Sequence, residues 1–268
     1  MKKKLNILTI AYLLFLILLF ASGSLSGVFS DFVYFLAFLL PFAFCLYMTR
    51  DEGVRCGEFL SVSRDGVQLF GPLVFPTILL TILLSYLTSL IIFRITGKTF
   101  SVDLGDSYII ALISHALLPA ILEEALFRYL PMRMIAPHSP RCAIIVSSIF
   151  FALIHTNLFQ IPYAFVGGII FMALDLATES IIPSVIIHFI NNALSVSMMF
   201  IPSPAIVYLI YVLIAMITVV SLSVAWRNRE EYQFQLILIT DKGEGVKFTW
   251  QMLLFIALTL VVAIISIL

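Results

Sequence analysis

Long apolar segments alternate with short polar segments over the whole chain. Apolar blocks lie near residues 5–22, 29–48, 69–93, 108–135, 142–157, 160–175, 181–200, 204–225 and 249–268. A run of about 20 apolar residues is long enough to cross the hydrocarbon core of a bilayer as a helix. The pattern predicts an all-α, polytopic transmembrane helix bundle of eight or nine helices. We expect residues 1–268 to form a single integral membrane domain, and the block at 160–175 carries the weakest signal.

The distribution of basic residues predicts how this bundle is oriented. With nine helices and the N-terminus in the cytoplasm, twelve Lys and Arg residues lie on the cytoplasmic side. Arg94 and Lys98 lie on the opposite side, and Arg128 lies within the membrane. Because cytoplasmic loops are enriched in Lys and Arg, we expect a multi-pass protein of the cell membrane with a cytoplasmic N-terminus. In the cytoplasmic loop 227–247, the alternation within 232–239 suits a short strand or an interfacial segment.

The composition indicates which partners and which kinds of cysteine site to expect. Apolar residues make up 62% of the chain, charged residues 11%, and the formal net charge is zero. The lipid bilayer is therefore the expected partner, and no bulk positive field points to nucleic acid. The three cysteines are widely spaced and indicate neither a disulfide scaffold nor a thiol-rich metal site. Residues 1–27 resemble a cleavable signal peptide, although a first transmembrane helix agrees better with the charge distribution.

Three ionisable side chains lie within six residues in the apolar stretch from Tyr108 to Leu130, namely Glu123, Glu124 and Arg128. Each charge at the centre of a membrane helix costs about 2.5–3.5 kcal/mol on insertion scales, so a functional role is the default interpretation. At spacing i, i+4, Glu124 and Arg128 share a helix face and can pair. Glu123 lies about 100° further round and remains available.

The two following helices carry further polar residues that can reach Glu123. Glu123 lies 14 residues before Pro137, and His155 lies 15 residues after Pro140. In an antiparallel helical hairpin this places Glu123 and His155 at nearly the same membrane depth, with Phe151 and His155 on one helix face. A carboxylate beside a neutral imidazole can take a proton from water.

His188 and Asn192 are again spaced i, i+4, on a helix entered at Pro183. They can offer two hydrogen-bond donors to a common point. Donors aimed at a developing oxyanion are worth roughly 2.7–4 kcal/mol each in well-studied hydrolases. Together with Glu123 and His155, they predict an attacking water and a charge-stabilising site within the membrane.

The motifs E-E-x-x-x-R, F-x-x-x-H and H-x-x-x-N occur in this order at Glu123–Arg128, Phe151–His155 and His188–Asn192. In order, spacing and membrane setting they resemble the CPBP intramembrane proteases, which include CAAX endopeptidases and bacteriocin-processing or immunity relatives. The resemblance covers about residues 108–200, which we expect to form the catalytic core. It implies an endopeptidase that cleaves a membrane-associated protein or peptide, in CAAX-type, leader-peptide or regulator processing.

The resemblance also implies a role for each motif residue. Glu123 and His155 would activate the hydrolytic water, and His188 with Asn192 would stabilise the tetrahedral oxyanion. Glu124, paired with its basic neighbour Arg128, would orient the site.

Cofactor chemistry remains a separate question. The family implies no obligatory metal and no other cofactor. Zinc bound by Glu123, His155 and His188 stays open as an alternative, because a carboxylate and two imidazoles are a known catalytic ligand set.

Other functions predict different roles for the same residues. A non-catalytic scaffold or a bacteriocin self-immunity protein would use the bundle to bind a partner, and an ion or proton transporter would use Glu123, His155 and His188 as a relay. An H-E-x-x-H zinc site is absent from the sequence. Ser148 lies two helical turns from His155, beyond hydrogen-bond reach for a serine mechanism.

Several polar or small residues in this region have structural interpretations. We expect the His115 side chain to make an interhelical hydrogen bond, and Asp175 and Glu179 to face water at a loop. Gly167-Gly168 most simply permits close helix packing, and it can also leave room for a substrate.

Overall fold

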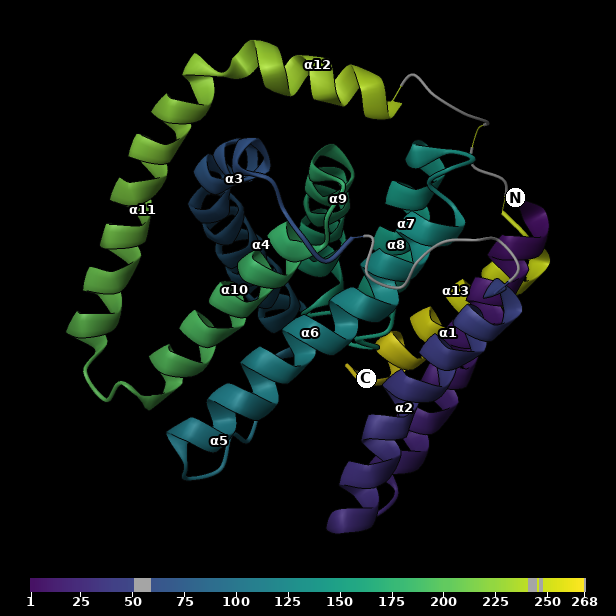
Figure 1. The fold of residues 1–268 in the computed structure, drawn as a ribbon. Coiled ribbons are helices and arrows are strands. Elements are labelled where there is room, and N and C mark those ends of the chain that lie inside the picture. The colour runs from purple at the N-terminus through teal and green to yellow at the C-terminus, as the bar shows by residue number, and fades with distance from the viewer. Residues whose placement is uncertain (51–58, 241–244, 246–247, 268) are drawn as a thin grey trace.

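The computed structural model describes residues 1–50, 59–240, 245 and 248–267, which form helices joined by short connections and no strand (Figure 1). The α-helices are α1 (Lys2–Gly23), α2 (Val28–Met48), α3 (Arg64–Phe70), α4 (Val74–Thr96), α5 (Tyr108–Leu112), α6 (Leu118–Glu124), α7 (Leu130–Met134), α8 (Pro140–Leu153), α9 (Ile161–Thr178), α10 (Ile182–Phe200), α11 (Pro204–Arg227), α12 (Arg229–Thr240) and α13 (Trp250–Ile265). The prediction of an all-α bundle is confirmed.

Each of the nine predicted apolar blocks contains a helix. Within the described residues, seven helical segments are long and apolar enough to cross a membrane, including the continuous runs Arg64–Thr96 and Tyr108–Met134. The other two blocks contain α8 and α13, which have 14 and 16 residues. At 1.5 Å per residue these two helices are shorter than the ~30 Å hydrocarbon core. The block with the weakest signal forms the 18-residue helix α9.

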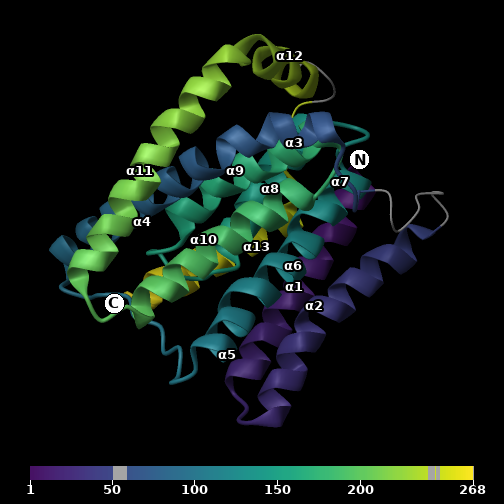
Figure 2. The same ribbon diagram turned by 60° about the vertical axis from the view of Figure 1, so that its left-hand side comes forward.

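The helices pack mainly as sequential hairpins, α1 with α2 and α8 with α9, while α10 lies against α6 and α9. The C-terminal α13 returns to pack against α1 and α8. Figures 1 and 2 show α11 at one edge of the bundle and α12 lying across its end, above α3 and α9. Segments 118–124, 140–153 and 182–200 are thereby brought together in the middle of the bundle.

An aromatic cluster packs α1 and α13 against α8 and the helical turn that follows the glutamates. The Tyr12 ring lies 4.7 Å from the rings of both Phe127 and Phe150, and Phe150 lies 4.5 Å from Phe255. All four side chains are fully buried. Aromatic pairs at these distances add to the stabilisation that comes from burial alone. The cluster ties α1, α8 and α13 to the segment that carries the paired glutamates.

Two π-helical turns, η3 (Ile113–Leu117) and η4 (Ala125–Tyr129), interrupt the run from α5 to α7. Such turns shift backbone carbonyls out of the regular ladder and occur often at functional sites. The Tyr12 hydroxyl donates to the Leu126 carbonyl at 3.2 Å, and the Ser147 hydroxyl donates to the Phe127 carbonyl. The second turn begins directly after Glu124, and these two hydrogen bonds from α1 and α8 hold its carbonyls.

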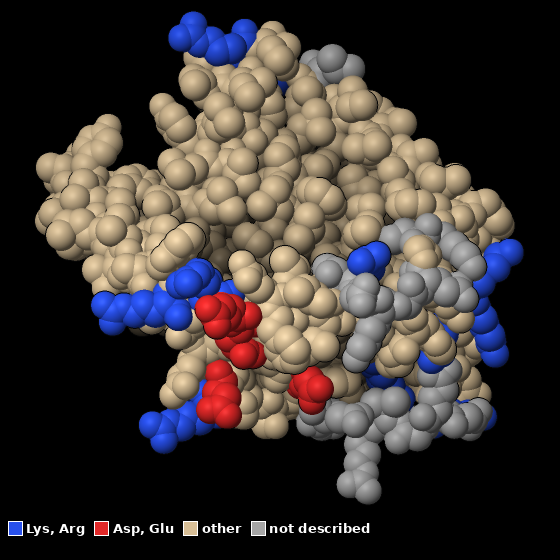
Figure 3. Space-filling view, turned by 90° about the horizontal axis from the view of Figure 1, so that it is seen from above, with Lys and Arg blue, Asp and Glu red and all other residues tan. Residues whose placement is uncertain are grey.

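Helix α12 replaces the strand considered for residues 232–239, so that alternative is wrong. The Tyr232 hydroxyl donates to the Leu69 carbonyl at 2.8 Å and fastens α12 to α3, while Phe234 and Ile237 are exposed. Figure 3 shows this end of the molecule, with Lys and Arg at several places on the rim and Asp and Glu in separate small groups. The distribution of basic residues also predicts a cytoplasmic loop at Arg50–Gln68, of which residues 51–58 lie outside the described residues.

Candidate active site

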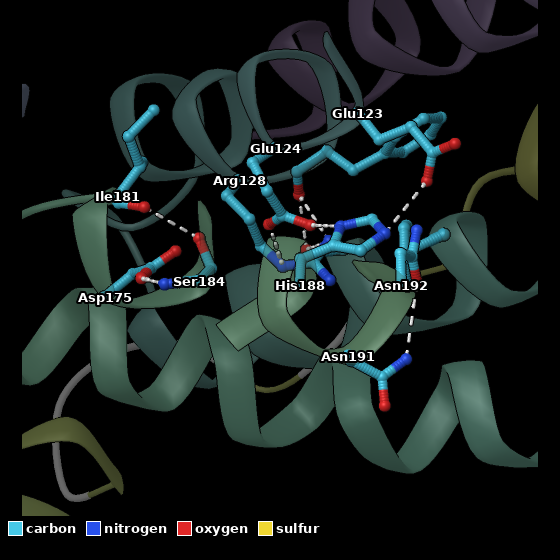
Figure 4. Close-up of polar contacts among 12 residues, drawn as sticks. Glu123, Glu124, Arg128, Asp175, Ile181, Ser184, His188, Asn191 and Asn192 are labelled. Atoms are coloured by element: carbon cyan, nitrogen blue, oxygen red, sulfur yellow. Dashed lines mark hydrogen bonds and ion pairs between the residues drawn. The ribbon is translucent and has the colours of Figure 1, made fainter. Parts of the chain in front are cut away.

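The adjacent glutamates at the end of α6 have different surroundings, as the sequence predicts. Glu124 is fully buried, whereas the Glu123 side chain is 15% exposed and lines a cavity of about 240 Å³. In Figure 4 the two carboxylates lie on either side of the His188 ring. Glu124 therefore belongs to the protein interior, and Glu123 faces the space that a substrate can enter.

Both oxygens of Glu124 are engaged by charged or ionisable partners. Its Oε2 lies 3.2 Å from Arg128 Nε, and its Oε1 lies 2.7 Å from His188 Nδ1. The Arg128 guanidinium also lies 4.3 Å from the centre of the Phe151 ring. The Glu124–Arg128 pair expected from the i, i+4 spacing is present. Its contact with His188 connects α6 to α10.

This contact determines how His188 can act. A carboxylate oxygen accepts, so Nδ1 of His188 is the donor to Glu124, and Nε2 faces Glu123 Oε2 at 3.9 Å. A neutral ring in this tautomer presents a lone pair at Nε2. Only a second proton on Nε2 allows His188 to donate to an oxyanion, and Glu123 is the group beside that nitrogen.

His155 lines the same cavity as Glu123 and His188, which places the two predicted water-activating residues together. Its Nδ1 lies 2.8 Å from the Phe151 carbonyl, so Nδ1 donates and Nε2 is left as an acceptor. Helix α8 ends at Leu153, however, and Thr156 has a left-handed φ of 46°. The expectation that the helix continues through His155 is therefore wrong; His155 reaches the cavity from the turn that follows α8.

Asn192 lies one helical turn after His188 on α10 and also lines the cavity. Its Nδ2 donates to the His115 carbonyl at 3.3 Å, and its Oδ1 accepts from Asn191 Nδ2 at 3.3 Å. Asn191 in turn accepts from the Thr81 hydroxyl at 2.9 Å. One amide hydrogen of Asn192 is used by the protein, and the second is left to meet a ligand.

The cavity has further polar walls that the sequence analysis did not single out. They come from four parts of the chain and are Tyr34, Thr81, Ser114, Gln160 and Tyr163. Isolated hydroxyl and amide residues in apolar helices carry no motif or spacing signal. Only the packing of the bundle brings them to the motif residues.

Two structural interpretations need correction. Asp175 does not face water: it is fully buried, and its Oδ1 accepts a hydrogen bond from the Ser184 backbone N–H at 3.0 Å. The His115 ring is exposed at the cavity wall, and it is the backbone carbonyl of His115 that makes the interhelical hydrogen bond. Glu179 is exposed as expected.

The arrangement of titratable groups bears on the zinc alternative. Glu123, His155 and His188 line one cavity. Yet across the described parts of the chain no three His, Cys, Asp or Glu side chains form a cluster that could hold a metal ion. What this cavity presents to a ligand is a carboxylate, two imidazole nitrogens and an amide.

Comparison with known proteins finds a family match for the central part of the chain. Residues 105–194 match the family described as type II CAAX prenyl endopeptidase Rce1-like, and this range contains all three motifs. No curated protein and no solved structure matches the chain. The family match confirms the resemblance and supports a CAAX-type intramembrane protease role at the level of the family.

Proposed function

We propose that this chain, whose residues 105–194 match the Rce1-like family of type II CAAX prenyl endopeptidases, is a glutamate-dependent intramembrane endopeptidase. Its substrate is a membrane-associated protein or peptide. The observation that carries the proposal is the convergence of Glu123, His155 and His188 on one cavity of about 240 Å³. The N-terminus lies in the cytoplasm in this proposal, as the basic residues predict.

Hydrolysis begins with a water molecule between Glu123 and His155. The acceptors are the carboxylate of Glu123 and Nε2 of His155, whose Nδ1 is held by the Phe151 carbonyl. One of them takes a proton from water as the water oxygen bonds to the scissile carbonyl carbon. The same proton then passes to the leaving nitrogen as the C–N bond breaks. No group outside the cavity is needed to balance this sequence.

The negative charge on the carbonyl oxygen needs donors on the opposite side of the reacting carbon. Asn192 supplies the amide hydrogen that is not used by His115, and doubly protonated His188 supplies Nε2–H. Glu124 and Arg128 do not reach the substrate. They hold the His188 ring through its Nδ1, so their role is to position it.

Cleavage of a fluorogenic peptide library by purified protein in nanodiscs tests the proposal. The comparison is between wild type, Glu123→Gln and the control Glu179→Gln, each with and without 1,10-phenanthroline. We expect cleavage by wild type and by the Glu179 variant, and a loss of about 10²–10⁴-fold in the Glu123 variant.

The other outcomes separate the competing functions. Loss of wild-type cleavage in the chelator would support the zinc alternative. A folded Glu123→Gln protein with full biological activity would favour a scaffold or immunity protein. Proton flux into liposomes without any peptide would favour transport.

A further inference from the structure

Gly167 and Gly168 are neighbours on α9, but they face different surroundings. A Cβ atom added at Gly168 would lie 3.1 Å from the Cα and 3.2 Å from the Cβ of Ser148 on α8. A Cβ added at Gly167 would meet a single atom within 4 Å, the methyl carbon of Thr81 at 3.4 Å. A side chain at Gly168 would therefore press on the Ser148 backbone where α8 and α9 approach closely, whereas a Cβ at Gly167 would make only an ordinary van der Waals contact.

Gly167 lies at the wall of the candidate active site, where it contributes no side chain. Gly167 lines the cavity that also contains Glu123 and His188. On the same helix, Ala164 and Phe171 line this cavity at positions i−3 and i+4 from Gly167. These spacings place the three residues on one face of α9. The face forms an apolar wall with a gap at its centre.

The chemistry around the gap is apolar although much of the cavity is polar. The Thr81 hydroxyl oxygen lies 2.9 Å from both Asn191 Oδ1 and the Ile78 carbonyl oxygen, which share its single hydrogen, and the Thr81 methyl group is the part nearest to Gly167. The single atom near a Cβ at Gly167 is therefore apolar, and Ala164 and Phe171 add apolar side chains on the same helix face. A polar substrate group placed here would lose its hydrogen bonds to water without gaining new ones.

The size of the cavity limits what can enter. Its volume of about 240 Å³ is smaller than the ~300–1,000 Å³ of pockets that enclose a drug-sized ligand. It can hold the scissile peptide group and a neighbouring side chain, but not a long stretch of substrate. Residues that fill or leave open this small space decide which side chain fits.

We propose that Gly167 is a specificity-determining residue, and that its missing side chain admits an apolar substrate side chain next to the scissile bond. This inference rests on the proposed function of the same cavity. It predicts a preference for substrates with a branched aliphatic residue at that position over substrates with a charged residue. It also predicts that a large side chain at position 167 changes the preference from large to small substrate side chains.

Replacement of Gly167 by Ala and by Leu tests the proposal. The substrates are one cleaved library peptide with Ala, Val, Leu or Lys at each position beside the scissile bond. We expect kcat/KM for the Leu peptide to fall in Gly167→Leu by about 10–200-fold relative to the Ala peptide, the range for one methylene group in an apolar pocket. Gly167→Ala should show a smaller shift in the same direction.

Gly168→Ala is the matched control for helix packing. It should lower the melting temperature, because its Cβ meets the Ser148 backbone, whereas Gly167→Ala should not. An identical size profile in wild type and Gly167→Leu would overturn the inference. So would an equal loss for all peptides in a Gly167→Leu protein that melts like wild type.

Peptides with Ala, Val, Leu or Lys at one position, built on the library peptide that binds most tightly to the Glu123→Gln protein, are also measured for binding to that protein by fluorescence anisotropy, with and without Gly167→Leu. Size-dependent binding that Gly167→Leu reverses supports the specificity pocket even where wild type cleaves nothing, an outcome that would overturn only the proposed hydrolysis. Binding that is indifferent to side-chain size overturns the inference whatever the catalytic result.

Discussion

Glu124 Oε1 lies 2.7 Å from His188 Nδ1, although 64 residues separate them in the chain. The other oxygen of Glu124 is held by Arg128 Nε at 3.2 Å. This buried carboxylate therefore connects a guanidinium on its own helical run with an imidazole on α10. Because both of its oxygens are engaged, Glu124 acts through His188 and leaves the cavity to Glu123.

Replacing Glu124 by Gln should destabilise the protein and lower its activity. The substitution leaves the buried Arg128 without a negative partner, and breaking a buried ion pair in this way costs about 3–5 kcal/mol. Thermal unfolding in nanodiscs measures the effect. The double variant Glu124→Gln/Arg128→Met should recover most of the stability and little of the activity. Recovery of full activity by the double variant would show that the pair does not position His188.

Replacing His155 by Ala should lower kcat by about 10²–10⁴-fold with a small effect on KM, because the side chain lost is a proton acceptor in the cavity. His155 makes its hydrogen bond to the backbone of its own turn, so we expect the fold to survive. Steady-state kinetics on the best library peptide measure the change. Added imidazole should restore part of the rate in this variant and none in Glu123→Gln. Unchanged kcat would remove His155 from the mechanism.

Replacing Asn192 by Ala should lower kcat by about 10²–10³-fold, the usual cost of losing one oxyanion donor. Asn191→Ala serves as the comparison, since Asn191 accepts from Thr81 and supports Asn192 without supplying the donor. We expect a smaller loss in this variant. Equal losses in the two variants would indicate that the pair orders α10 and that Asn192 has no separate role at the reacting carbon.

Asp175 and Ser184 provide a prediction about stability. Asp175→Ala would leave the buried Ser184 N–H in the first turn of α10 unsatisfied, at a cost of about 1–3 kcal/mol. Asp175→Asn keeps an acceptor oxygen and should be closer to wild type. Melting temperatures of the three proteins decide the point. Because α10 carries His188 one turn later, activity should fall in the same order; a variant with Ala as stable as wild type would contradict the assignment.

Much of the architecture follows from the sequence alone, because the length of an apolar run is a local property. A run of about 20 apolar residues must form a helix in lipid, where every backbone polar group needs an internal partner. The Glu124–Arg128 pair was predictable for the same reason, since i, i+4 spacing places two side chains on one helix face. The separation of Glu123 from Glu124 also follows from helical geometry.

Only the tertiary structure decided which residues meet across helices. The sequence placed His188 and Asn192 on one helix face, and the packing of α10 on α6 adds a contact that no spacing predicts, between His188 Nδ1 and Glu124 Oε1. It also buries Asp175, and it leaves one of two adjacent glycines open to the cavity. These outcomes depend on distances between segments that are far apart in the chain. Helical periodicity determines the face on which a residue lies, but the neighbouring helix determines what that face contacts.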